Sequence, residues 1–179
     1  MVTNWNEMVT KPFLEGRISE AFASADAIID DFTESALREL YSDRKSLDLI
    51  NEIHFLRNRV NFDGLVLLEI LKSKTVVDDS FVQKVRQFKK ARDLVLHSPE
   101  GEYALVLGNQ ALHYSSQEQL DKHAETQATK AIASAYEIFL KLIEVAAKVG
   151  KEREEYFTPD FYRKNPRGKV AQQKYPKNK

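Results

Sequence analysis

The sequence predicts an all-α protein, a bundle of about five to six helices with one small β-hairpin inserted near residues 103–114. Apolar residues recur at alternating spacings of three and four along most of the chain, which is the pattern of helices with one buried face. The chain has 179 residues, of which 42% are hydrophobic and 30% charged, and this suits a globular domain with a sizeable core. We therefore expect a single helical domain at residues 17–150, between an N-terminal extension (1–16) and a C-terminal tail (151–179).

The composition also excludes several classes of function. There is no cysteine, so thiol catalysis, disulfides and cysteine-rich zinc sites are excluded. The histidines and glutamates lack a metal-ligand spacing such as H-E-x-x-H, and there is no glycine-rich phosphate loop. We expect neither a metal nor a cofactor. No apolar run is long enough to span a bilayer, and the N-terminus lacks a signal pattern, so a cytoplasmic location is expected.

Four helices are predicted before residue 78. The first has an apolar face formed by Ile18, Phe22, Ala25, Ile29 and Phe32. A short second helix is indicated by Leu37, Leu40 and Tyr41, and a third by Leu49, Ile53, Leu56 and Val60. Residues 61–64 interrupt it, and Asp63 is a candidate N-cap for a helix through Leu65, Leu68 and Leu71.

A further helix is expected to begin at Asp78-Asp79-Ser80, where the carboxylates supply a cap and complement the helix dipole. It should end by His97, because Ser98 precedes a proline and is disfavoured in the α region.

The pattern changes after this helix. Residues 103–107 form a short apolar run, and Gly108-Asn109 follows, with glycine at the first position of a two-residue turn. This combination predicts a type II′ hairpin over residues 103–114.

A long helix is predicted from about Gln117 to Val149, with Gly150 as its stop. Its apolar seam consists of Ala128, Ile132, Ala135, Phe139, Leu142 and Ala146. Small residues in this seam allow close helix packing. The seam is expected to be intramolecular core, with part of a dimer contact as the alternative.

Charge is unevenly spread although the total is balanced. After Asp160 the chain has seven basic residues and no acidic one, which leaves twenty basic and twenty-seven acidic residues in the remainder. The basic tail either contacts an anionic partner or is a solvated, disordered terminus.

Arg92 interrupts an apolar stripe. Phe81, Val85 and Phe88 recur at spacings of four and three, and the next positions of the stripe are Arg92 and Val95. A guanidinium is always charged, and burying it without a partner is costly. Arg92 must therefore face a carboxylate, a partner subunit or an anionic ligand.

His97 lies five residues after Arg92, about 140° away on an ideal helix. Because His97 is expected at the helix end, its ring can turn back towards Arg92. Such a pair can act on a phosphodiester: the histidine transfers protons near neutral pH, and the guanidinium stabilises the transition state. If a 2′-hydroxyl is the internal nucleophile, no metal is needed and the substrate is RNA.

The run Arg92-Asp93-Leu94-Val95-Leu96-His97 resembles the motif of the HEPN superfamily, in which arginine, a polar residue and a histidine follow one another at this spacing. The superfamily contains all-α domains of toxin–antitoxin modules, abortive-infection systems and CRISPR effectors. The resemblance implies a homodimeric, metal-independent endoribonuclease acting in defence or stress. It also implies Arg92 and His97 as the catalytic pair, Asp93 as the residue that orients them, and a cognate antitoxin or effector protein as a further partner.

Other basic residues are candidates for contacts with RNA. Arg86, Lys89 and Lys90 lie just before Arg92, where they form either a phosphate-binding strip or an ordinary solvated face. Arg57 opens a second near-match, Arg57-Asn58-Arg59-Val60-Asn61-Phe62, in which phenylalanine replaces the histidine. The alternative function is a non-catalytic helical interaction module, with Arg92 in a structural ion pair and His97 as a cap.

Overall fold

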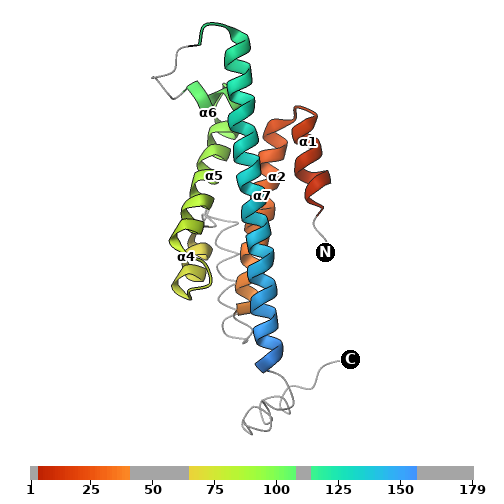
Figure 1. Ribbon diagram of the computed structural model, residues 1–179, viewed down its shortest axis with the longest axis vertical. Coiled ribbons are helices and arrows are strands. Elements are labelled where there is room, and N and C mark those ends of the chain that lie inside the picture. Colours follow the sequence, from red (N-terminus) through yellow and green to blue (C-terminus); the bar gives the residue numbers. More distant parts are fainter. Residues whose placement is uncertain (1–3, 41–64, 108–113, 157–179) are drawn as a thin grey trace.

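The computed structural model describes residues 4–40, 65–107 and 114–156, and in these residues all regular structure is helical. The long helices α2 (Ile18–Leu40), α5 (Asp79–His97) and α7 (Gln117–Tyr156) pack side by side and form the body of the molecule (Figure 1). The shorter α4 (Leu65–Ser73) packs near the start of α5, and α1 (Lys11–Leu14) lies against α2. The predicted helical bundle is thus confirmed.

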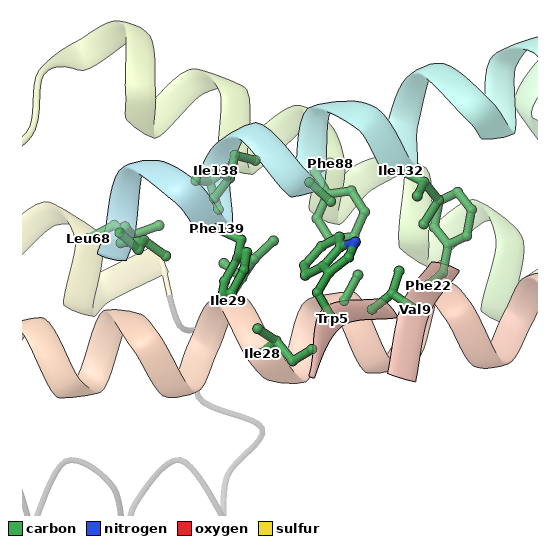
Figure 2. Close-up of a cluster of buried hydrophobic side chains, with 14 of the residues drawn as sticks. Trp5, Val9, Phe22, Ile28, Ile29, Leu68, Phe88, Ile132, Ile138 and Phe139 are labelled. Carbon is green, nitrogen blue, oxygen red and sulfur yellow. The ribbon is translucent and has the colours of Figure 1, made fainter. Parts of the chain in front are cut away.

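The N-terminal segment is helical and contributes to the core. The π-helical turn η1 (Asn6–Thr10) leads into α1, and the buried side chains of Trp5 and Val9 belong to the main apolar cluster (Figure 2). Gly16, with φ of +76°, reverses the chain after α1, a conformation that glycine adopts without strain. The segment expected to be an extension therefore packs as part of the bundle.

Helix α2 is longer than predicted. Leu37 and Leu40 belong to the same helix as Ile18, so the prediction of a separate short helix at this point was wrong. No proline or glycine interrupts residues 18–40, and the Thr33 hydroxyl donates a hydrogen bond to the Ile29 carbonyl within the helix. The predicted helix at residues 49–60, Tyr41 and the Asp63 cap lie outside the described residues.

Helix α5 has the predicted ends. Asp78 is its N-cap, and its carboxylate accepts a hydrogen bond of 2.8 Å from the Phe81 amide. The helix ends at His97, and Ser98 is extended before the proline. Both predictions are confirmed.

The predicted β-hairpin is wrong for its first half. Residues 101–107 form a short 3₁₀ turn, η2 (Gly101–Tyr103), and the helical turn α6 (Ala104–Leu107), while residues 108–113 lie outside the described part. A short apolar run fits a strand and a buried helical turn equally well by periodicity. Here the turn buries Val106, and the Tyr103 hydroxyl donates a 3.0 Å hydrogen bond to Asp121 of α7, which raises the pKa of Tyr103.

Helix α7 begins at Gln117 as predicted but continues through Gly150 to Tyr156, so the predicted stop was wrong. A glycine inside a helix costs only about 1 kcal/mol relative to alanine, and the charged residues that follow it are good helix formers. The predicted seam is core: Ala128, Ile132, Ala135, Phe139 and Leu142 are all buried.

Aromatic contacts join the elements of the core. The Trp5 ring stacks on Phe139 at 5.0 Å between centroids, and Phe32 meets Phe139 edge-on at 5.1 Å. Phe22 of α2 stacks on Phe88 of α5 at 5.9 Å. None of the described helices is long and apolar enough to cross a membrane.

Truncating Trp5 should test whether the N-terminal segment is part of the folded unit. We expect Trp5→Ala to lower the free energy of unfolding by about 3 to 5 kcal/mol, because it empties a site between α7 and the N-terminal segment. Leu14, which is 78% exposed, provides the control: Leu14→Ala should change stability by no more than about 0.5 kcal/mol. Equal denaturation midpoints for the two variants would show that the segment is dispensable.

Candidate functional site

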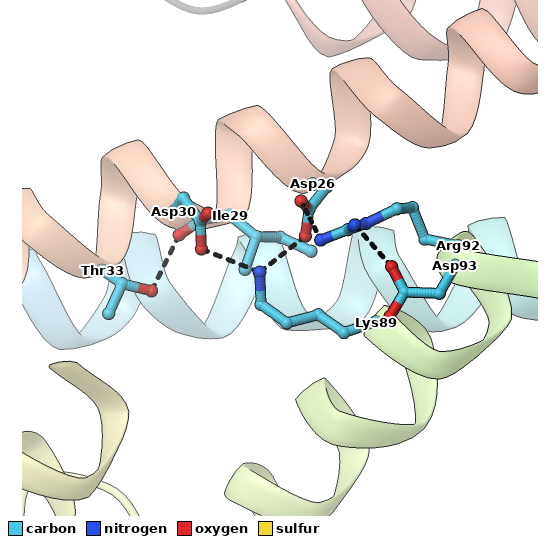
Figure 3. A network of polar contacts seen from close by, with 7 residues as sticks. All are labelled: Asp26, Ile29, Asp30, Thr33, Lys89, Arg92 and Asp93. Carbon is cyan, nitrogen blue, oxygen red and sulfur yellow. Dashed lines mark hydrogen bonds and ion pairs between the residues drawn. The ribbon is translucent and has the colours of Figure 1, made fainter. Parts of the chain in front are cut away.

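A network of charged side chains joins α5 to α2 in the middle of the bundle (Figure 3). The cations come from Lys89 and Arg92, three residues apart on α5. The carboxylates come from Asp26 and Asp30, four residues apart on α2. Residues at these spacings lie on one face of a helix, so the four side chains meet across one contact.

Lys89 is the buried centre of this network. Its side chain is 7% exposed, and its ammonium lies 2.7 Å from an Asp26 oxygen and 3.0 Å from an Asp30 oxygen. The predicted strip of three basic residues is therefore interrupted, because Lys89 faces α2. Its charge holds α5 on α2 and does not reach a ligand on the surface.

Arg92 bonds to the second oxygen of Asp26, at 2.7 Å, and to Asp93 of its own helix, at 2.5 Å. Of the three outcomes that the sequence allows for this partly buried arginine, the structure therefore shows a carboxylate partner. The side chain is 21% exposed. Its Nε is buried without a hydrogen-bond partner in the described part of the chain.

Asp93 and His97 lie nearer the solvent. The Asp93 side chain is 56% exposed, and its carboxylate accepts the hydrogen bond from Arg92. His97 is the exposed last residue of α5, and the described residues offer its ring no hydrogen bond. The arrangement thus places a fixed guanidinium and a solvent-accessible imidazole near the same end of one helix.

The remaining predicted basic residues have different surroundings. Arg86 donates a 2.7 Å hydrogen bond to Glu69 of α4, and both side chains are more than two-fifths exposed. Lys90 is exposed and forms no ion pair with the described residues. Arg57 lies outside the described part.

Asp26 and Asp30 are the site residues that sequence reasoning missed. They follow Ala25 and Ile29 of the predicted apolar face, so they lie at its edge, where the sequence pattern predicts solvated side chains. The signal was Arg92, which lies on the apolar stripe of another helix. A partly buried arginine requires an acidic partner. Asp26 lies at the edge of the apolar face of α2, opposite Arg92.

Among the described residues, the network joins Lys89 and Arg92 to Asp26, Asp30 and Asp93. A groove of about 350 Å³ lies between α5 and α7, but neither Arg92 nor His97 lines it. In the described residues no group of three or more acidic or histidine side chains is placed to hold a metal ion.

Comparison of the chain with protein-family models, with curated proteins and with solved structures gave no match in any of the three. The resemblance to the HEPN superfamily therefore stands on the motif and the helical fold.

Removing Asp26 should show how strongly the network holds the bundle. We expect Asp26→Ala to destabilise the fold by about 3 kcal/mol, because two largely buried cations lose their shared partner. Asp31→Ala is the matched control, since Asp31 is the exposed aspartate next to Asp30 on the same helix, and we expect a change within about 0.5 kcal/mol. Urea denaturation of both variants measures the difference. Similar values would mean that the network contributes little net stability.

Proposed function

We propose that the protein is a metal-independent endoribonuclease of the HEPN type, acting in defence or stress in the cytoplasm. His97 transfers protons and Arg92 stabilises charge on the phosphate, with Asp93 orienting the guanidinium. The observation that carries the proposal is the exposed imidazole of His97, which lies at the end of the helix that also holds Arg92 in a fixed position.

The surroundings of His97 suit proton transfer. An imidazole can both accept and donate a proton, and His97 ends α5 at the surface. Among the described residues, no side chain forms a hydrogen bond with the His97 ring, so the ring is available to a substrate.

The surroundings of Arg92 suit the stabilisation of charge. A guanidinium has five N–H donors, and the contacts with Asp26 and Asp93 use two of them. Two carboxylates fix the plane of the group before a substrate arrives, which reduces the reorganisation that binding requires. The exposed fifth of the side chain is the part that a phosphate reaches.

The reaction follows from these groups. The 2′-hydroxyl attacks the phosphorus, the bond to the 5′-oxygen breaks, and the products are a 2′,3′-cyclic phosphate and a 5′-hydroxyl. One imidazole must accept the proton of the 2′-hydroxyl while an acid protonates the leaving oxygen. Two copies of His97 supply both groups if a homodimer brings them together, as the resemblance implies.

Helix α7 carries an exposed apolar face on which a dimer can form. Its exposed apolar stripe, which we call the α7 stripe, consists of Ala133, Tyr136, Leu140, Ile143 and Ala147. These positions alternate spacings of three and four, so the stripe can pack on a second copy of itself about a two-fold axis. The flanking Glu137 and Glu144 are already paired with Lys84 and Lys141, which limits repulsion between copies.

The chemistry is tested by replacing the imidazole. We expect His97→Ala to reduce cleavage of a mixed-sequence RNA by about 10²-fold or more, because it removes the proton-transfer group. Cleavage should persist in EDTA and fail on DNA and on 2′-O-methyl RNA, both of which lack the nucleophile. Arg92→Ala should reduce the rate similarly, with its melting temperature measured to separate catalysis from folding.

His123→Ala is the matched control, because His123 is a partly buried histidine on α7 that contacts Tyr114 and Gln127. It should cleave RNA at the wild-type rate. A wild-type protein without activity on RNA, or a His97→Ala variant as active as the wild type, would refute the enzymatic proposal.

The dimer is tested on the α7 stripe. Leu140→Asp should convert a dimer to a monomer, because it places a charge in the middle of an apolar contact. Leu107→Asp is matched to it, since Leu140 and Leu107 are both 47% exposed but lie on different helices. Light scattering at micromolar concentration measures both. A monomeric wild type would refute the dimer, and loss of the dimer only in the Leu107 variant would place the contact elsewhere.

A second function is favoured by the pairing of Arg92. Because Asp26 and Asp93 already neutralise its charge, Arg92 also fits a purely structural role, and the protein would then be a non-catalytic helical interaction module. Under this alternative the α7 stripe still forms a dimer, but neither the wild type nor the His97→Ala variant cleaves RNA.

A further inference from the structure

The groove between α5 and α7 lies apart from the Arg92 network. The two helices run antiparallel, and the turn α6 lies beside them at the end where α5 finishes (Figure 1). The groove has a volume of about 350 Å³ and takes its lining from all three elements. It is independent of the proposed ribonuclease function, because it contains neither Arg92 nor His97.

The middle of the groove is lined by short aliphatic side chains, which leave a depression between the helices. Ala91 of α5 and Ala131 of α7 face it with side chains too short to fill the space between the helices. Leu94, which is 39% exposed, adds apolar surface at the end near α6. Small residues at such a position let a third helix approach closely, and its larger side chains fill the depression.

The rim of the groove is basic on both sides. Lys90 stands on the α5 wall and Lys130 on the α7 wall; both are exposed, and neither forms an ion pair with the described residues. Lys84 and Lys141 of the same two helices, in contrast, are paired with glutamates. No acidic residue lines the groove, so both edges present uncompensated positive charge.

We propose that this groove binds an acidic amphipathic helix from a partner protein. Aliphatic side chains on one face of that helix fill the space over Ala91 and Ala131. Glutamates or aspartates on both edges pair with Lys90 and Lys130. This is helix-in-groove recognition, in which apolar anchors give affinity and the charged rim gives orientation and selectivity.

The same features argue against two other occupants. Single-stranded RNA binds through stacking on exposed aromatic rings, whereas the one aromatic residue lining the groove, Phe88, is 2% exposed. The chain's own C-terminal tail carries seven basic residues and no acidic one after Asp160, so its charge has the same sign as the rim.

The test uses a designed helical peptide of about five turns with leucines on one face and glutamates on both edges. Fluorescence anisotropy measures its binding to the full chain. We expect saturable binding below about 1 mM, and a loss of about tenfold in affinity when Lys90→Glu and Lys130→Glu are combined. A peptide with lysines in place of the glutamates should bind this double variant better than it binds the wild type.

Two controls separate the groove from general attraction. Lys148→Glu reverses the charge of an exposed residue of α7 outside the groove, and it should leave binding of the acidic peptide unchanged. A peptide of the same composition with its apolar face scrambled should bind at least tenfold more weakly. In amide NMR spectra the designed peptide should shift the signals of Ala91 and Ala131 and leave that of Leu140 unchanged.

The proposal is overturned if the wild type does not bind the acidic peptide, if it binds the scrambled peptide equally well, or if the double variant keeps wild-type affinity. It is also overturned if a single-stranded RNA, and not the peptide, loses binding in the double variant. None of these readouts depends on RNA cleavage, so they stand apart from the result for His97.

Discussion

The pairing of Asp26 with both Lys89 and Arg92 determines how the rest of the bundle is arranged. Each oxygen of this one carboxylate bonds a different cation of α5, so the helix can neither slide nor rotate on α2 without breaking a largely buried ion pair. An apolar contact alone tolerates small shifts, whereas a buried charge requires one position. The stacked rings of Phe22 and Phe88 pack in the same α2–α5 contact.

This constraint gives α5 two different faces. With Lys89 and Arg92 turned to α2, Lys90, Ala91 and Leu94 are directed to the opposite side, where they line the groove with α7. His97 then falls at the exposed end of the helix. One interaction between two helices thus sets the position of the candidate catalytic pair and of the separate docking groove.

Helix α7 carries a similar division along its length. Its seam of alanines and larger apolar residues is buried against α2 and α5, while Tyr136, Leu140 and Ile143 remain exposed on a neighbouring face. A helix that is apolar over so wide an arc has more apolar surface than the described helices cover. The second face therefore supports both proposed functions, since each requires a protein contact.

Signals that depend on one or two neighbouring residues were the ones that the sequence predicted best. The Asp78 cap and the end of α5 before Pro99 depend on neighbouring residues, and the structure confirms both. The local pattern does not decide whether residues 103–107 form a strand or a helical turn, or whether α7 continues through Gly150. Both depend on packing and on weak propensities. For the candidate site, the sequence required a partner for Arg92 but did not identify Asp26, and it left Lys89 on the surface.

The charge of the network bears on how a ribonuclease built on it would work. Asp26 and Asp93 already compensate the charge of Arg92, so little of it remains to attract a polyanion at long range. Attraction of RNA must then come from charge elsewhere in the chain, and the seven basic residues after Asp160 are its largest uncompensated source. Under the proposed function, the tail would supply affinity for the phosphate backbone, and Arg92 would act only on the one phosphate that is brought to it. Separating the two roles lets a largely buried, rigid guanidinium serve both the packing of α5 and the chemistry.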